Sequence, residues 1–262
     1  MRPKLIIFVL LLGLFTSSAT QGQDSQTLTV FAASSLTDAL EETATAFEAE
    51  NPGATVIFNF GGSSTLAAQL VEGAPADVFA SANTRQMQVA LEAGRITNQP
   101  ITFIRNLLVL ITPADNPAHI ESLRDLADPG IRFVVAAPGV PVRVYTDVML
   151  SRLASVPTYG SDYRAAVLTN IVSEEDNVRQ VFLKVALGEA DAGIVYQSDV
   201  TPDSADQVLT IPIPRVVNSL ATYPIAITDD TSHPELAQAF VDFVLANDGQ
   251  AIMERWGFLP VN

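Results

Sequence analysis

The 262-residue chain contains no cysteine and only two histidines. The absence of cysteine excludes disulfides, zinc–cysteine sites, a thiol nucleophile and a lipid-modified N-terminal cysteine. His119 and His233 stand far apart, each in a loop beside proline, and neither belongs to a metal-ligand pattern. The composition therefore argues against thiol chemistry and against a histidine metal centre.

Basic residues are also scarce, because 14 Lys and Arg stand against 29 Asp and Glu and give a formal net charge of −15. Nucleic-acid binding needs a basic surface that replaces counterions, so the charge argues against a nucleic-acid partner. An anionic ligand would have to be held by local N–H and O–H dipoles rather than by net charge. With 48% hydrophobic residues, the chain is long enough for one large domain or two lobes.

No stretch after residue 19 has 18 unbroken apolar residues, the length typical of a membrane-spanning helix. The apolar run from Leu5 to Phe15 is shorter than that, follows the basic residues Arg2 and Lys4, and precedes small residues that end at Ala19. This pattern predicts a cleavable signal peptide over residues 1–19. We expect residues 20–27 to form a flexible tether and the mature protein to be extracytoplasmic, in a periplasm if the cell has one.

From Leu28 onward, short apolar strands alternate with helices whose apolar residues fall at helical spacing. The first units are a strand over 28–33, a helix from 36 to about 50, a strand over 55–60 and a helix from 66. Such alternation predicts an α/β fold with a mainly parallel sheet. Further on, the acidic run 174–177 is expected to begin a helix, because carboxylates stabilise a helix N-terminus.

Two pairs of serines, Ser34–Ser35 and Ser63–Ser64, each follow a strand and precede a helix. A helix N-terminus has unpaired N–H groups and a partial positive charge. Serine at this position either caps the helix or leaves its hydroxyl and the N–H groups to an anion. One pair alone indicates capping. Two successive pairs favour a shared anion site, because ligands in α/β sheets bind at the carboxyl ends of the strands.

The residues around both serine pairs resemble the two serine motifs of the molybdate-binding proteins of bacterial ABC importers. The similarity extends from about Leu28 to the end of the chain and is specific in its combination of motifs. The runs that carry it are Phe31–Ala39, Phe60–Ala67, Gly73–Ala82, Val140–Val142, Glu175–Arg179, Gly193–Asp199 and Gln250–Phe258.

This resemblance implies a type II bilobal periplasmic-binding-protein fold, with two mixed or parallel sheets and a ligand cleft between the lobes. Residues 28–106 and 219–262 would form lobe 1, and residues 107–218 lobe 2. The family captures molybdate, and by the same chemistry tungstate, and delivers it to an ABC importer permease with its ATPase. We therefore expect a monomer that needs no cofactor.

The resemblance also implies five ligand-binding positions. Ser35 and Ser63 would each give a hydroxyl and a backbone N–H, Val142 and Val178 would give backbone N–H groups, and Tyr196 would give its hydroxyl. A site made only of donors suits a fully deprotonated dianion and rejects phosphate, which keeps a proton at neutral pH and needs an acceptor.

Three further residues are expected directly behind these ligands: Ser34, Ser64 and Arg143. Arg143 departs from the family pattern, which usually has glycine there. Its side chain would either crowd the start of the helix or bring a positive charge near the cleft.

Two other functions remain open at the level of sequence. The first is a binding protein for a different anion, such as sulfate or an organic anion, which would share the fold and differ in the size of the pocket. The second is an exported serine hydrolase. It is disfavoured because the chain has no Gly-x-Ser-x-Gly elbow and no histidine placed to act as a base. The sequence therefore favours a binding protein over an enzyme.

Overall fold

A computed structural model of the chain describes residues 26–261. The expected signal peptide and residues 20–25 of the expected tether lie outside the described residues. The tether assignment is wrong for Gln26 and Thr27, which begin strand β1 (Gln26–Ala33). These two residues pair in parallel register with Ala54 and Thr55, and this pairing gives their backbone groups partners in the sheet.

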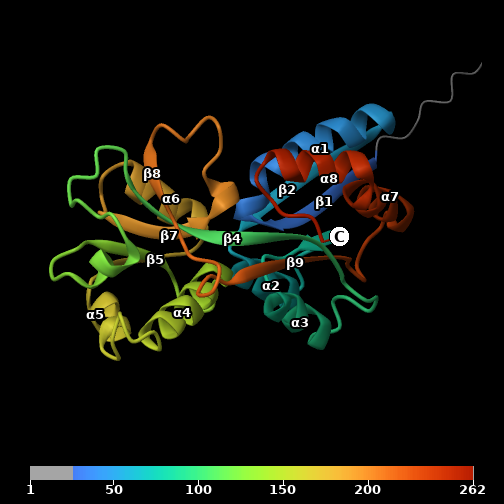
Figure 1. Ribbon diagram of the computed structural model, residues 1–262. Coiled ribbons are helices and arrows are strands. Elements are labelled where there is room, and N and C mark those ends of the chain that lie inside the picture. The colour runs from blue at the N-terminus through green and yellow to red at the C-terminus, as the bar shows by residue number, and fades with distance from the viewer. Residues whose placement is uncertain (1–25, 262) are drawn as a thin grey trace, which may run out of the picture.

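The elements gather into two lobes (Figure 1). In the first lobe the strands lie in the order β2, β1, β3, β9, β4, and helices cover the sheet. Its remaining elements are β2 (Ala54–Gly61), β3 (Val78–Ala80), β9 (Leu220–Ile227), α1 (Thr37–Glu50), α2 (Ser63–Val71), α3 (Thr84–Glu92), α7 (Pro234–Leu245) and α8 (Asn247–Arg255).

The second lobe continues the sheet from β4 through β7 and β5 to β6, while β8 pairs with β4. Its elements are β5 (Phe133–Ala136), β6 (Ile171–Glu175), β7 (Ala192–Tyr196), β8 (Val208–Pro212), α4 (Pro141–Ala154), α5 (Tyr163–Thr169) and α6 (Val178–Ala186). Short 3-10 helices occupy Ser34–Leu36, Leu123–Ala127 and Gln197–Asp199.

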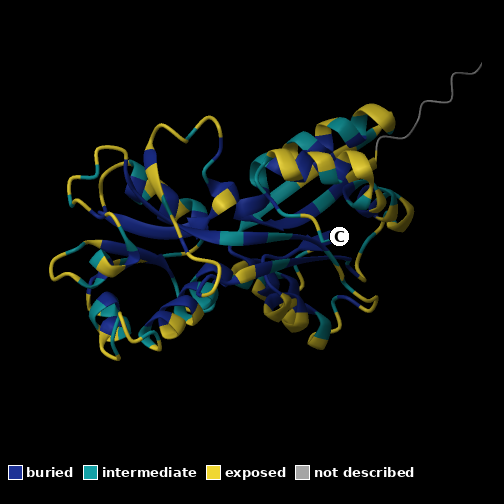
Figure 2. Ribbon diagram, in the orientation of Figure 1, coloured by how far each residue is buried: buried dark blue, intermediate teal, exposed yellow. Residues whose placement is uncertain are grey.

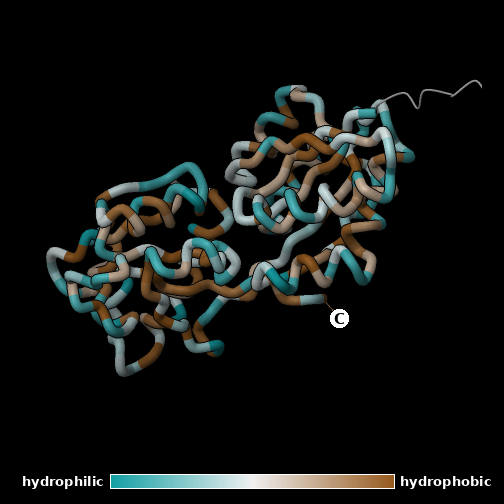
Figure 3. The backbone as a smooth tube through the Cα atoms, turned by 90° about the horizontal axis from the view of Figure 1, so that it is seen from above, coloured by the Kyte–Doolittle hydropathy of each residue, from teal (hydrophilic) through white to brown (hydrophobic). Residues whose placement is uncertain are grey.

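Strand β4 (Ile101–Pro113) belongs to both lobes. It pairs with β9 as far as Leu107 and with β7 from Leu108 onward. Figure 3 shows the two lobes joined by a narrow waist. All pairings of β4 and β9 are antiparallel, whereas β1 pairs in parallel with β2 and β3, and β5 with β6 and β7. The sheet is therefore mixed rather than mainly parallel, because the strands near the waist run against their neighbours.

Burial follows the layers, with buried strands inside and exposed outer helix faces (Figure 2). In the first lobe, Phe47 of α1 meets Phe240 of α7 edge to face, with ring centroids 5.3 Å apart. Burying an aromatic side chain of this kind stabilises the fold by roughly 1.5–3 kcal/mol. Among residues 26–261, no helix is long and apolar enough to cross a membrane.

The acidic run does not begin a helix, contrary to the expectation from sequence. Glu174 and Glu175 belong to β6, where they pair with β5. Helix α6 begins only at Val178, and the side chain of Asn177 caps it by accepting from the Gln180 N–H at 3.2 Å. The carboxylates are satisfied by ion pairs instead, Glu175 with Lys184 at 3.0 Å and Glu174 with a second-lobe arginine. Sheet pairing thus overrides the preference of carboxylates for a helix start.

Candidate ligand-binding site

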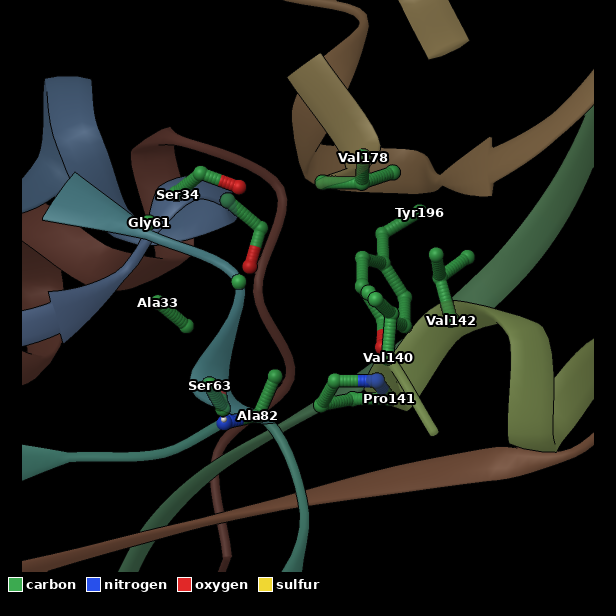
Figure 4. Close-up of a pocket in the computed structure, with 12 residues that line it drawn as sticks. Ala33, Ser34, Gly61, Ser63, Ala82, Val140, Pro141, Val142, Val178 and Tyr196 are labelled. Carbon is green, nitrogen blue, oxygen red and sulfur yellow. Dashed lines mark hydrogen bonds between the residues drawn. The ribbon is translucent and has the colours of Figure 1, made fainter. Parts of the chain in front are cut away.

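A small pocket lies between the two lobes. In Figure 4, Ser34, Gly61 and Ser63 lie on one side of it, and Val142, Val178 and Tyr196 on the other. The first group comes from the first lobe and the second from the second lobe. The lining residues are Ala33, Ser34, Ser35, Gly61, Gly62, Ser63, Ala82, Val140, Pro141, Val142, Val178 and Tyr196.

Four helix starts meet at this pocket: the 3-10 turn before α1, and helices α2, α4 and α6. The first i to i−4 bonds of α2, α4 and α6 are donated by Leu66, Val144 and Val181. The N–H groups of Ser63, Val142 and Val178 precede these bonds, so they have no partner within their own helices. No side chain caps the 3-10 turn, α2 or α4. The pocket is therefore lined with N–H donors and with the positive ends of helix dipoles.

The two serine hydroxyls are buried and already hold one hydrogen bond each. Ser63, 1% exposed, accepts from the backbone N–H of Ala82 at 3.0 Å. Ser35 shares a 2.9 Å hydrogen bond with the hydroxyl of Tyr223, a fully buried tyrosine on β9. When Tyr223 donates, both serine oxygens act as acceptors within the protein. Both serine O–H groups are then free to donate into the pocket.

Tyr196 ends β7, is 1% exposed, and its hydroxyl has no hydrogen-bond partner among residues 26–261. Burial raises the pKa of Tyr196 well above its usual value, so the phenol keeps its proton at neutral pH. An unpartnered buried hydroxyl is costly, and a ligand that accepts its hydrogen bond removes this cost. The phenol is thus a further O–H group that can donate a hydrogen bond to a ligand in the pocket.

Asp199 lies behind Tyr196 and is 0% exposed. One of its carboxylate oxygens accepts from the Tyr196 N–H at 2.9 Å, and the other has no hydrogen-bond partner in the described part of the chain. Burial raises the pKa of Asp199 to about 7, although the nearby Arg179 favours the ionised form. Asp199 does not line the pocket, so it offers no acceptor to a ligand there.

The pocket contains no acidic or basic side chain among its described lining residues. In residues 26–261 there is also no group of three or more His, Cys, Asp or Glu that would hold a metal ion. The chemistry available in the pocket is therefore hydrogen-bond donation from N–H and O–H groups to a small acceptor-rich anion.

The structure places the five sequence-predicted ligand positions, Ser35, Ser63, Val142, Val178 and Tyr196, around this one pocket. Of the three residues expected behind them, Ser34 lines the pocket itself, whereas Ser64 does not. The guanidinium of Arg143 is directed to the backbone oxygen of Ala136 at 3.0 Å and to Glu174 at 2.6 Å. Arg143 therefore neither enters the pocket nor crowds the start of α4.

Sequence reasoning missed three contributors, Tyr223, Ala82 and Gly62. Tyr223 is 188 residues from the serine it contacts, and Ala82 acts through its backbone, so neither carries a local signal. Gly62 lies against the opposite lobe, where a Cβ atom would overlap the backbone oxygen of Asp176. Its neighbours in the Gly-Gly-Ser-Ser run indicate a close backbone approach, but not what approaches.

Comparison with known proteins shows the family and the fold of the chain. Residues 28–259 match the family described as bacterial extracellular solute-binding protein. The molybdate-binding protein ModA of Mycobacterium tuberculosis is 39% identical over 243 residues, which cover 93% of this chain and 88% of the relative.

Two solved structures share the fold. The periplasmic molybdate-binding protein of Azotobacter vinelandii has a TM-score of 0.76 and 23% identity, and the match covers 90% of this chain and all of that one. The sulfate-binding protein SubI of Mycobacterium tuberculosis has a TM-score of 0.81 and 18% identity, with 90% and 88% covered. These likenesses confirm the bilobal periplasmic-binding-protein fold expected from sequence. The match over residues 28–259 shows to which family the chain belongs. The chain belongs to the family of bacterial extracellular solute-binding proteins.

Proposed function

We propose that this protein captures molybdate, and with similar chemistry tungstate, in the pocket between its lobes. The proposal rests on one observation: the pocket is lined by hydrogen-bond donors and by no charged side chain. The donors are the hydroxyls of Ser35, Ser63 and Tyr196 and the N–H groups at the helix starts. A fully deprotonated tetrahedral dianion accepts hydrogen bonds at every oxygen, so it matches such a site. Hydrogen phosphate has an O–H that would find no acceptor there, and we expect its rejection.

The 39% identity to a molybdate-binding protein favours molybdate over sulfate. The sulfate-binding structure is similar in fold only, at 18% identity, so it carries no argument about the ligand. Molybdate and tungstate are nearly equal in size, and the same donors serve both.

The protein would act outside the cytoplasm as the receptor of an ABC importer, after removal of residues 1–19 as a signal peptide. Closure of the two lobes on the anion would produce the form that docks on the permease. An enzymatic role is not favoured, because neither serine has a base beside it. The hydroxyl of Ser35 meets a tyrosine and that of Ser63 meets a backbone N–H. We propose a monomer that binds its ligand without a cofactor.

Thermal unfolding of the mature protein with molybdate, tungstate, sulfate or phosphate tests the function. A ligand present at about 100 times its dissociation constant adds about 2.7 kcal/mol of stability, which a melting curve resolves. We expect molybdate and tungstate to raise the melting temperature and phosphate to have no effect. Ser63→Ala should weaken the molybdate effect, with affinity reduced roughly tenfold to a hundredfold.

Ser64→Ala is the matched control, because Ser64 is the adjacent serine and does not line the pocket. It should bind molybdate as the wild type does. A response to sulfate alone would assign the site to a sulfate-binding protein, and no response to any of the four anions would refute capture of a tetrahedral dianion.

Tyr196→Phe should affect the loaded protein far more than the free one. The hydroxyl has no partner among the described residues of the closed protein, but water reaches it once the lobes separate, so its loss should change the stability of the ligand-free protein by less than about 1 kcal/mol. Loss of the same donor should weaken molybdate binding by about tenfold. Urea unfolding without ligand and calorimetric titration with molybdate measure the two effects. A variant that binds molybdate as tightly as the wild type would remove Tyr196 from the site.

A further inference from the structure

Arg179 is the second residue of α6 and lies next to the pocket residue Val178, but does not itself line the pocket. Its guanidinium reaches across to the first lobe, where it forms an ion pair with Asp38 of α1. It also donates from Nε to the backbone oxygen of Ser34 at 3.3 Å. Both first-lobe partners stand at the helix start that carries Ser35. Arg179 therefore joins the two sides of the pocket from behind.

Within its own lobe, Arg179 lies 3.8 Å from the buried carboxylate of Asp199. Asp199 in turn accepts from the N–H of Tyr196. This contact belongs to the second lobe alone, so it persists when the lobes separate. It keeps the guanidinium beside the rim of the pocket. The contact with Asp38 exists only when the lobes meet.

We propose that Arg179 is a positioning residue whose ion pair with Asp38 holds the lobes closed and slows the release of the bound oxyanion. This inference rests on the proposed function. The side chains of Arg179 and Asp38 are 28% and 30% exposed, so the pair is partly shielded from water and stronger than a fully exposed one. Opening the cleft would return both charges to water, and the contact therefore favours the closed state.

A different role for Arg179 predicts the opposite change in molybdate affinity for the variant Asp38→Asn. If the guanidinium attracted the anion only through its charge, the carboxylate of Asp38 would oppose binding, and Asp38→Asn would tighten it. If the ion pair holds the lobes closed, Asp38→Asn weakens binding and accelerates release. We expect release of molybdate to become about three- to tenfold faster, with little change in the association rate.

Stopped-flow measurement of molybdate association and release tests the proposal in the wild type and in Asp38→Asn, Arg179→Gln and the double variant. The double variant should release molybdate no faster than the faster single variant, because one interaction is lost in all three. Glu41→Gln is the control: it removes the same charge from the same helix, and Glu41 is exposed and forms no ion pair among residues 26–261. It should behave as the wild type.

The outcomes separate this inference from the function on which it rests. If the wild type does not bind molybdate, the proposed function fails. If the wild type binds and Asp38→Asn tightens binding or leaves the release rate unchanged, the function stands and the role of Arg179 is refuted. Melting of the ligand-free variants serves as the folding control, and Asp38→Asn should melt within a few degrees of Glu41→Gln.

Discussion

Gly62→Ala is expected to abolish tight molybdate binding while leaving the first lobe folded. Gly62 precedes α2 with φ −62° and ψ 131°, a conformation that alanine adopts without strain. Its added Cβ would overlap the backbone oxygen of Asp176, which belongs to the opposite lobe. Because a backbone oxygen cannot swing away, the lobes must stay apart. The N–H groups of Val142 and Val178 would then no longer reach an anion held by Ser63.

Loss of the donors of one lobe removes several hydrogen bonds to a charged ligand, each contributing about 1.5–3 kcal/mol. We expect at least about a hundredfold weaker binding of molybdate by calorimetric titration. Gly61→Ala is the folding control, since a Cβ there meets only the side chain of Leu66, at 3.4 Å and beyond, and no atom of the opposite lobe. Because Gly61 lines the pocket, the wild type is the reference for affinity. Unchanged affinity in Gly62→Ala would mean that the anion is bound without closure of the lobes.

Asp199→Asn is expected to change the pH dependence of stability. Burial raises the pKa of Asp199 to about 7 in the folded protein, above the ordinary value of 3.8. Between these two values, the unfolded chain releases the proton and the folded protein keeps it. The contribution of Asp199 to the free energy of unfolding therefore falls as pH rises through this window, by about 1.4 kcal/mol per pH unit. Above about pH 7 both states are ionised and the loss is complete.

Other carboxylates titrate in the same range, so the informative quantity is the difference between variant and wild type. The free energy of unfolding of Asp199→Asn, relative to that of the wild type, should rise by on the order of 2–3 kcal/mol between pH 5 and pH 7, and by little more up to pH 8. Urea unfolding at these pH values, without any oxyanion, measures the gain. The exposed Asp203→Asn controls for loss of one negative charge. A pH-independent difference for Asp199→Asn would show that Asp199 titrates normally.

The residues proposed for the site could be predicted from sequence where side chains mark them. Ser35 and Ser63 stand at strand–helix junctions, and the position of each junction follows from hydrophobic periodicity. The donors proposed at Val142 and Val178 are backbone N–H groups, which no side chain signals, so only the family resemblance indicated them. Their actual affinity for an anion stays a prediction.

Contacts between distant segments could not be predicted. Tyr223 meets Ser35, and Arg179 meets Asp38, across more than a hundred residues of sequence. The first contact depends on how β9 packs in the first lobe, and the second on how the two lobes meet. The helix start expected at Glu174 and Glu175 is wrong for a similar reason, because pairing with β5 decides the conformation of these two residues. Local sequence preferences predict where helices and strands lie along the chain. The contacts between distant segments and the conformation of Glu174 and Glu175 depend instead on how the folded elements pack together.

The most direct test is a crystal structure of the mature protein with molybdate, with diffraction data collected at the molybdenum absorption edge. The anomalous signal locates the metal atom of the anion independently of any interpretation of the pocket. We predict one strong peak between the lobes, with oxygens of the anion in hydrogen-bond contact with the hydroxyls of Ser35, Ser63 and Tyr196 and with the N–H groups of Val142 and Val178. A peak outside this pocket, or none under conditions where molybdate raises the melting temperature, would contradict the proposed site.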